Sequence, residues 1–242
     1  MKLLMKIFNF LIRKFKNVLK RLVLPLLPKR TRYKKCLSGQ ISYSQAGQDI
    51  FVRAMLKSKM NGSYVELGAF DAVWDSNTYL LESQLGWKGI SFEIEGALVK
   101  KFNQERKNRC FEADATKVDY AEFFATENIP SRVDYLSLDI EPAEQTLATL
   151  KVLPLEKYRF SVITYEHDNY VSGPACMNEA RKILEKHGYF RVISNLNSEG
   201  RDFEDWWVDP EAVDEKLYQE IISQNVEYQE VIKRLNRLNQ YD

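Results

Sequence analysis

The sequence lacks several features that would place it at once in a familiar class of protein. Its three cysteines, Cys36, Cys110 and Cys176, lie far apart and form no Cys-x-x-Cys pair. This spacing supports neither a disulfide framework nor a zinc site, and it favours a reducing compartment, so we expect a cytoplasmic protein. No internal repeat or low-complexity segment is visible, and a chain of 242 residues fits one α/β domain with a substantial core.

Acidic residues are missing from the first part of the chain, where the first one is Asp49. Residues 1–35 carry twelve of the 35 Lys and Arg residues and no acidic residue. The rest of the chain carries the other 23 basic residues and all 34 acidic ones. The net charge of +1 therefore hides a basic arm followed by an acidic domain. Polar and apolar residues of the arm each recur with a helical period, which predicts a basic amphipathic helix over 1–28 and a linker over 29–43.

The arm also lacks the uninterrupted run of about 20 apolar residues that a membrane span needs, and no small-residue cleavage site follows it. One interpretation is a helix lying on an anionic membrane surface, which would make the protein peripheral on that membrane. The other is a helix packed on its own domain or on a partner. We favour the first because the solvent face carries no acid. Nucleic-acid binding is not expected, since the aromatic side chains lie on the apolar face and not among the charges.

From Ser44 onward the chain alternates strand-like and helix-like segments. The predicted strands are residues 63–67, 88–95, 109–114, 133–141, 160–167 and 189–196. The predicted helices are residues 76–85, 97–105, 118–127, 143–153 and 175–188, followed by a polar helix from Pro210. This alternation predicts an α/β domain over 44–242 with a doubly wound, mostly parallel sheet. Ligands bind such sheets beyond the carboxyl ends of the strands.

Glycine is scarce at the turn after the first predicted strand. A dinucleotide-binding turn carries G-x-G-x-x-G, whereas only Gly68 follows the strand here, which counts against a nicotinamide-dependent oxidoreductase. A lone glycine still lets a ligand approach the backbone closely. Carboxylates, in contrast, follow five consecutive strands. They are Glu66 and Asp71, Glu93 and Glu95, Asp114, Asp139 and Glu141, and Glu166 and Asp168.

This row of carboxylates suits a ligand with hydroxyl groups, an ammonium or a sulfonium, or a divalent metal ion. S-adenosylmethionine presents the first three. Glu93, after the second strand, has the place of the acidic residue that accepts hydrogen bonds from both ribose hydroxyls in dinucleotide folds. Each strand-end carboxylate taken alone could equally cap a helix, so only their combination points to such a ligand.

Several blocks of sequence together resemble the FkbM family of S-adenosylmethionine-dependent methyltransferases. They are Y-S-Q-A-G-Q-D-I-F-V (43–52), Y-V-E-L-G-A-F-D-A-V-W-D-S-N-T-Y-L-L-E (64–82), G-W-K-G-I-S-F-E-I-E (86–95), D-Y-L-S-L-D-I-E-P-A-E (134–144), V-I-T-Y-E-H-D (162–168) and F-E-D-W-W-V-D-P-E (203–211). The resemblance implies a class I, Rossmann-like methyltransferase fold and O-methylation of a hydroxylated acceptor such as a sugar or polyketide. Phe70 and Pro142 depart from the family's pattern, because smaller residues are usual at both places.

The resemblance also implies roles for individual residues. Glu66, Gly68 and Asp71 match the first cofactor motif, Glu93 the ribose-binding acid and Asp114 the residue near the adenine amino group. Asn77, in the S-N-T-Y block, is a further candidate cofactor residue.

The chemistry of methyl transfer points to the ends of the fourth and fifth predicted strands. Asp139 either holds the acceptor directly or joins Glu166 and Asp168 around a magnesium ion that makes an acceptor hydroxyl more acidic. His167 is a candidate general base. Because neighbouring strand residues face opposite ways, Glu166 and His167 share the site only if the chain turns there.

Two functions of different class follow from these observations. The first is an O-methyltransferase acting on a sugar or glycoconjugate near a membrane. The second is a binding or trafficking protein at a membrane surface that keeps the methyltransferase fold without the activity.

Overall fold

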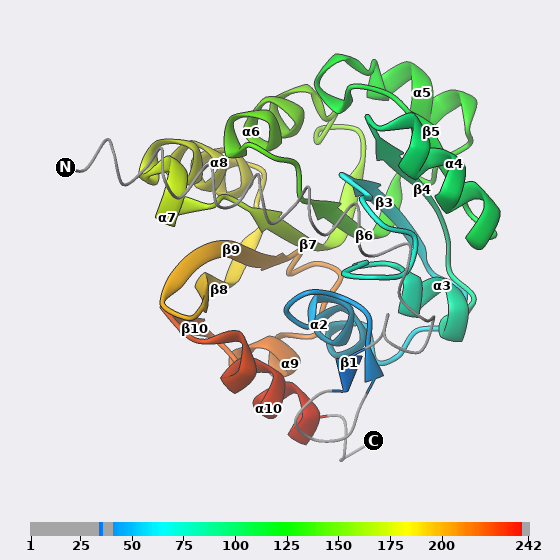
Figure 1. Cartoon of the computed structure of the whole chain (residues 1–242). Helices are drawn as coiled ribbons and strands as arrows, with labels where there is room; N and C mark the ends of the chain where they lie inside the picture. The colour runs from blue at the N-terminus through cyan, green and yellow to red at the C-terminus, as the bar shows by residue number, and fades with distance from the viewer. Residues whose placement is uncertain (1–33, 36–40, 239–242) are drawn as a thin grey trace.

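Figure 1 shows the chain as a computed structural model, in which helices cover both faces of a central sheet; residues 34–35 and 41–238 are described. The predicted helix over 1–28 and most of the predicted linker, 29–43, lie outside the described residues. In the described part of the linker, β1 (Lys34–Lys35) pairs antiparallel with β2 (Ile41–Ser42). Within the described ranges, no helix is long and apolar enough to cross a membrane.

Strands and helices alternate along the chain, as the sequence predicts. The strands that follow are β3 (Ser63–Leu67), β4 (Lys88–Glu93), β5 (Arg109–Glu112), β6 (Arg132–Leu138), β7 (Arg159–Glu166), β8 (Phe190–Ser198), β9 (Arg201–Val208) and β10 (Ser223–Gln224). The helices are α2 (Gln48–Met55), α3 (Tyr79–Leu85), α4 (Gly96–Glu105), α5 (Tyr120–Thr126), α6 (Ala143–Val152), α7 (Asn169–Ser172), α8 (Pro174–Lys186), α9 (Glu215–Gln219) and α10 (Tyr228–Leu238). A short 3-10 helix, Ala115–Lys117, follows β5.

The eight strands from β3 to β10 form one sheet in the order β10-β8-β9-β7-β6-β3-β4-β5. β3 pairs in parallel with both β4 and β6, and parallel pairing continues to β5 on one side and to β7 on the other. This doubly wound, mostly parallel order is Rossmann-like and confirms the predicted fold class. The direction of winding reverses between β3 and β6, which is where open α/β sheets bind their ligands.

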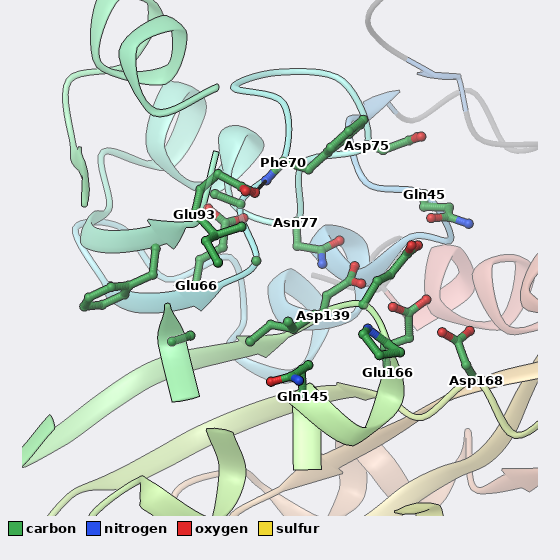
Figure 2. A pocket seen from close by; sticks show the side chains of 18 of the residues that line it. Gln45, Glu66, Phe70, Asp75, Asn77, Glu93, Asp139, Gln145, Glu166 and Asp168 are labelled. Carbon is green, nitrogen blue, oxygen red and sulfur yellow. Dashed lines mark hydrogen bonds between the residues drawn. The ribbon is translucent and has the colours of Figure 1, made fainter. Parts of the chain in front are cut away.

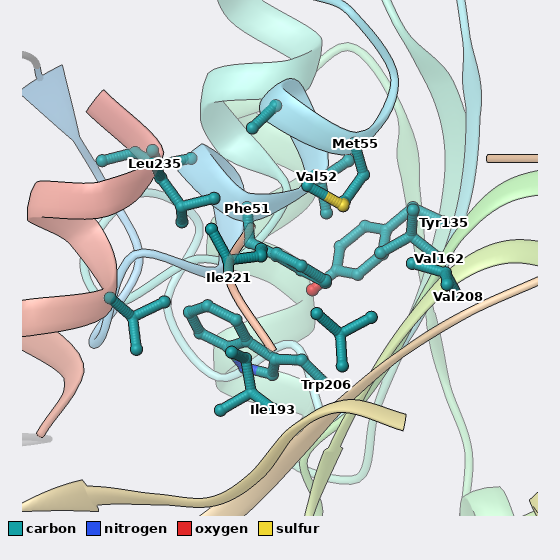
Figure 3. Close-up of a cluster of buried hydrophobic side chains, with 14 of the residues drawn as sticks. Phe51, Val52, Met55, Tyr135, Val162, Ile193, Trp206, Val208, Ile221 and Leu235 are labelled. Carbon is teal, nitrogen blue, oxygen red and sulfur yellow. The ribbon is translucent and has the colours of Figure 1, made fainter. Parts of the chain in front are cut away.

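Strand β9 has no counterpart among the elements predicted from the sequence, and the same is true of α2 and α7. Strand β9 lies antiparallel between β7 and β8 and carries the E-D-W-W block. Trp206 and Trp207 alternate faces along it. Trp206 stacks on Phe51 of α2, with ring centroids 4.6 Å apart, while Trp207 packs into the opposite face of the sheet. Figure 3 shows Trp206 and Phe51 within the first of these two cores.

The two faces of the sheet are covered by different helices. Helices α2, α3, α9 and α10 cover the face that holds Trp206, and α5, α6 and α8 cover the face that holds Trp207. Tyr135 and Leu136 of β6 divide between the two cores in the same way. Complete burial of such side chains contributes about 1.5–3 kcal/mol each, so residues of β6, β7 and β9 anchor both layers.

The C-terminal region differs from the prediction of a polar helix from Pro210. It folds as α9, the short edge strand β10 and α10. Val231, Ile232 and Leu235 of α10 are buried in the core shared with α2. The polar composition was misleading because the charged residues of α10 occupy one face only.

Candidate functional site

A cavity of about 720 Å³ opens at the carboxyl ends of β3 to β7, at the point where the winding of the sheet reverses. Figure 2 shows it from close by, with the strand-end carboxylates directed toward it from several strands. Eight of the ten predicted site residues line this cavity. They are Glu66, Gly68, Asn77, Glu93, Asp114, Asp139, Glu166 and Asp168.

The turn after β3 requires glycine at its first position. Gly68 has φ +92°, and a Cβ added there would lie 2.0 Å from the backbone oxygen of Asp139. The β3 turn and the end of β6 therefore approach as closely as two backbones can. The amides of Gly68 and Ala69 both donate to the carbonyl of Phe92, 3.0 Å away, which ties the turn to the end of β4 as well.

Glu93 and Phe70 fix the rest of this turn. One carboxylate oxygen of Glu93 accepts the Phe70 amide and the other accepts the Glu95 amide, both at 2.9 Å. Phe70 has φ +50°, and it lines the cavity without filling it. Each Glu93 oxygen keeps a second lone pair for a ligand hydroxyl.

The Glu66 side chain is 2% exposed at the inner wall of the cavity. One of its oxygens accepts hydrogen bonds from the Ser91 hydroxyl at 2.7 Å and the Thr78 hydroxyl at 3.0 Å. Removal from water raises the pKa of Glu66 to about 7, although the nearby Arg106 guanidinium opposes the shift. A cationic ligand group beside this carboxyl would favour its ionised form.

Asn77 presents an unused acceptor to the cavity. Its side-chain amide nitrogen donates to the Ser137 hydroxyl at 2.9 Å, and Asn77 is only 4% exposed. Its buried Oδ1 has no hydrogen-bond partner. A buried acceptor left unpaired costs about 1–3 kcal/mol, so this oxygen calls for a donor from a ligand in the cavity.

Asp71 does not line the cavity, contrary to the prediction that it binds the cofactor. Its carboxylate accepts the amides of Val73 and Trp74 and pairs with Lys101. The backbone folds back after Phe70, so the Asp71 side chain points into the loop and holds the loop's shape. Any influence of Asp71 on a ligand acts through that loop.

Arg106, which was not predicted from the sequence, holds the same loop in place without lining the cavity. Its guanidinium is buried and donates to Glu82, to the Ala72 carbonyl and to the Tyr64 and Thr78 hydroxyls. Burial alone would lower the pKa of this arginine, but the surrounding acidic groups raise it, so the group is a cation. One side chain thus joins the loop after β3 to α3 and α4.

The end of the cavity beside β4 and β5 combines an apolar wall with one carboxylate. Ile94 is 64% exposed there and lies with Phe92, Ala113 and Ala115 on the cavity wall. Asp114 accepts from both the backbone and the hydroxyl of Thr116 and pairs with Lys117 at 2.8 Å. These bonds lower the pKa of Asp114 to about 2, so it is ionised at neutral pH.

Asp139, Glu166 and Asp168 all line the opposite end of the cavity (Figure 2). Among the residues that the structure describes, however, no three His, Cys, Asp or Glu side chains converge closely enough to hold a metal ion. The predicted magnesium site is not formed by this arrangement, because the three carboxylates come from separate positions on the cavity wall. No chemical step is therefore assigned to a metal.

His167 is not at the cavity, so the structure contradicts its assignment as a general base. Its side chain is completely buried, and its Nε2 lies 3.4 Å from Asp205, which also binds Arg181. Strand alternation sends Glu166 and His167 to opposite faces. The chain then turns, with Asp168 at φ +45°, and this turn brings Asp168 back to the cavity.

Part of the cavity wall comes from segments that do not follow a parallel strand. Gln45, Arg201 and Phe203 are the clearest cases. The motif that contains Gln45 also holds Gln48, whose amide donates to buried Glu204 at 2.9 Å, so the E-D-W-W block and the Y-S-Q-A-G-Q-D block are in direct contact. The resemblance marks both blocks, but no local pattern indicates that they meet.

Comparisons with known proteins find only distant structural likenesses. No protein-family model matches the chain, and no curated protein matches it. Among solved structures, S. pombe Dnmt2 methyltransferase is 16% identical with a TM-score of 0.47; the match covers 61% of this chain and 48% of that one, about half its length. A putative rRNA methylase from Clostridium thermocellum is 13% identical with a TM-score of 0.48, over 69% and 95% of the two chains. Human methyltransferase-like protein 13, in complex with SAH, is 12% identical with a TM-score of 0.46, over 81% and 89%.

At these identities and scores, the likenesses carry no information about what the chain acts on. Any functional conclusion therefore depends on the cavity and its residues.

Proposed function

We propose that this chain is an S-adenosylmethionine-dependent methyltransferase of FkbM type that methylates a hydroxyl group of a sugar or glycoconjugate. The observation that carries the proposal is the wall of the cavity at the β3–β6 switch point. There the Gly68 turn and two buried carboxylates, Glu66 and Glu93, meet the unpaired Oδ1 of Asn77. All three side chains accept hydrogen bonds, and none of them is suited to a pyrophosphate.

The residues present fit this cofactor, part by part. Glu93 would accept the ribose hydroxyls, since it ends the second strand and keeps free lone pairs. Glu66 and Asn77 would accept the ammonium group, which meets the need of Asn77 for a donor. Ile94 and the wall beside it would cover the adenine ring, with Asp114 ionised at its edge.

The bound cofactor supplies a methyl group on a positively charged sulfur. In the transfer, an oxygen–carbon bond forms, the sulfur–carbon bond breaks, and the acceptor hydroxyl must lose its proton. Asp139 is the residue that we assign to hold the acceptor hydroxyl and receive that proton, because it lines the cavity beside the Gly68 turn. Holding the oxygen in line with the methyl group supplies much of the acceleration.

The charge of the cavity favours a neutral or cationic acceptor over a nucleic acid. Four carboxylates line the end of the cavity away from Glu93 in Figure 2, and Arg201 is also part of the cavity wall. The four are Asp75, Asp139, Glu166 and Asp168. Phosphate groups would be repelled from this excess of carboxylates, whereas hydroxyl groups would find acceptors.

We further propose that residues 1–28, which lie outside the described part of the chain, hold the domain at an anionic membrane surface.

Calorimetric titration of the full-length chain with S-adenosylmethionine tests the proposal. We expect saturable binding by the wild type and at least about tenfold weaker binding by Glu93→Gln, because a hydrogen bond to a charged acceptor contributes about 1.5–3 kcal/mol. Glu122→Gln, at an exposed position of α5 outside the cavity, is the matched control and should bind like the wild type.

Two results would count against the proposal at different levels. If the folded wild type does not bind S-adenosylmethionine, the proposal that the chain is a methyltransferase is refuted, and a non-catalytic protein at a membrane surface becomes the better explanation. If it binds but transfers no methyl group to any glycoside in a radiolabelled assay, the cofactor assignment stands and the acceptor assignment fails.

A further inference from the structure

A second, smaller cavity of about 230 Å³ adjoins the first on the side away from Glu93. Four residues line both cavities, so a ligand that passes from one to the other would contact all of them. They are Gln45, Asp75, Ser198 and Phe203. Figure 2 places Gln45 and Asp75 on the same side as Asp168, at the end where the acceptor would bind.

The wall of the small cavity combines aromatic rings with polar groups. Trp74, Phe203 and Tyr228 supply the rings, from the loop after β3, from β9 and from the start of α10. The shared residues Gln45 and Asp75 supply an amide and a carboxylate. Flat rings beside a few hydrogen-bonding groups suit a sugar ring, which has apolar C–H faces and hydroxyl groups around its edge.

Two pairs of contacts hold this wall in place. Ser44 and Asp75 form an isolated parallel β-bridge, which keeps the Gln45 segment beside the loop after β3. At the other side, the Glu227 carboxylate accepts the amides of Glu199 and Gly200 at 3.0 and 2.9 Å. The tip of the β8–β9 hairpin is therefore attached to the residue that precedes Tyr228, and the cavity wall is preformed.

The volumes of the two cavities indicate how large a group each can hold. The larger one falls in the range of about 300–1,000 Å³ that is usual for complete ligand sites. The smaller one falls below that range and has the volume of about eight liquid waters. It can take one ring, but it has no room for a second cofactor.

We propose, as an extension that rests on the function proposed above, that the small cavity binds the sugar ring next to the one that is methylated. The acceptor is then a chain of at least two linked sugar rings. Its methylated ring lies beside Asp139 and Glu166, and its neighbouring ring lies against Tyr228 and Trp74. Both rings contact the shared wall between the cavities.

Saturation-transfer NMR on the full-length chain with bound S-adenosylhomocysteine tests this extension. The probes are the methyl glycosides of glucose, galactose, mannose and N-acetylglucosamine, together with cellobiose, galactobiose, mannobiose and chitobiose. We expect at least one disaccharide to bind about 2- to 13-fold more tightly than its monosaccharide, with saturation of the protons of both rings. This range corresponds to about 0.5–1.5 kcal/mol for a packed pair of rings.

Variants connect that difference to the small cavity. Tyr228→Leu keeps apolar packing against the core but removes the flat ring, and it should abolish the preference for the disaccharide. Trp74→Leu tests the same wall if Tyr228→Leu does not fold. Tyr170→Leu is the matched control: Tyr170 lines only the larger cavity, so this variant should weaken both sugars equally and leave their ratio unchanged.

The outcomes separate this extension from the function on which it rests. If S-adenosylhomocysteine binds while the disaccharides bind no better than their monosaccharides, or fail to bind, the two-ring acceptor is overturned and the cofactor site stands. An unchanged preference in both Tyr228→Leu and Trp74→Leu also overturns it. If S-adenosylhomocysteine itself does not bind, the methyltransferase proposal fails and this extension fails with it.

Discussion

The buried carboxyl of Glu66 makes the stability of the domain depend on pH in a defined window. Burial raises its pKa from the ordinary 4.5 to about 7 in the folded protein, so the folded state keeps this proton to a higher pH than the unfolded state does. The contribution of Glu66 to stability is therefore fully present below pH 4.5. It declines as the pH rises toward 7 and is constant above that.

The magnitude follows from the shift. At about 1.4 kcal/mol per pKa unit, ionisation of Glu66 costs the folded state about 3.5 kcal/mol in total, of which about 2.5 kcal/mol falls between pH 5 and pH 8. Glu66→Gln retains the shape of the side chain and an acceptor for Ser91 and Thr78, but it cannot ionise. The variant should therefore lack this part of the pH dependence.

Urea denaturation of the wild type and of Glu66→Gln at pH 5 and pH 8 measures the effect. The wild type should lose about 2.5 kcal/mol more unfolding free energy across this interval than the variant, since all other carboxyls titrate alike in both. Glu122→Gln, exposed on α5, should follow the wild type. Saturating S-adenosylmethionine should restore stability at pH 8 more in the wild type than in Glu66→Gln, because its ammonium would pair with the ionised carboxyl.

Parallel pH profiles of the wild type and Glu66→Gln, within about 0.5 kcal/mol, would refute this reasoning. Such a result would mean that Arg106 and the two hydroxyl donors compensate fully for the loss of water around the carboxyl.

Three further changes test other parts of the molecule. Gly68→Ala should lower the unfolding free energy, measured by thermal denaturation, by at least about 2 kcal/mol, because the added Cβ meets the Asp139 carbonyl. Gly200→Ala, at a similar φ of +73° but with open space around it, should lower the unfolding free energy by about 1 kcal/mol. Equal losses in the two variants would contradict the close approach of β3 and β6. Arg106→Lys should lower the unfolding free energy by about 3–5 kcal/mol, because it breaks a buried set of hydrogen bonds. Arg109→Lys, at the exposed start of β5, should change the unfolding free energy by less than about 1 kcal/mol. The full-length chain should float with anionic liposomes, and raising the salt concentration should weaken this binding; flotation with neutral liposomes alone would contradict the role assigned to residues 1–28.

The features of the fold that depend on local pattern could be predicted from the sequence. The parallel strands and the helices between them follow from alternating apolar segments, and the switch point then follows from the general behaviour of such sheets. Glu66, Glu93 and Asp139 reached the cavity for that reason: each ends or follows a strand whose carboxyl end must point there. Gly68 could be assigned because it is the one glycine in the turn after the first predicted strand, where a missing Cβ lets a ligand approach the backbone.

The directions of side chains within turns could not be predicted in the same way. Glu66 lies near the end of β3 and Asp71 follows this strand, but the turn at Phe70 directs the Asp71 carboxylate into the loop. His167 follows β7, but strand alternation buries it beside Asp205. A residue's position after a strand limits where its backbone lies, and only the φ angles of the turn decide where its side chain points.

Long-range placement set a second limit. The E-D-W-W segment mixes charged and aromatic residues, and nothing local indicates that it forms a strand running antiparallel between β7 and β8. In α10, three apolar residues among many charged ones form a buried stripe only because α2 lies opposite them. Both elements contribute to the wall that we propose for the acceptor, so that side of the cavities is where the sequence was least informative.

This difference between the two ends of the site has a consequence for specificity. The proposed cofactor end is built from the ends of β3, β4 and β5, whose positions are fixed by the parallel core of the sheet. The proposed acceptor end also depends on the β8–β9 hairpin, on Tyr228 and on the Gln45 segment. Glu227 attaches the hairpin to the residue before Tyr228, and the Ser44–Asp75 bridge attaches the Gln45 segment to the loop after β3. We expect substitutions in the hairpin or at Tyr228 to reshape the space for the proposed acceptor without moving the Gly68 turn or Glu93. A change of acceptor therefore requires no change in the residues proposed to bind the cofactor.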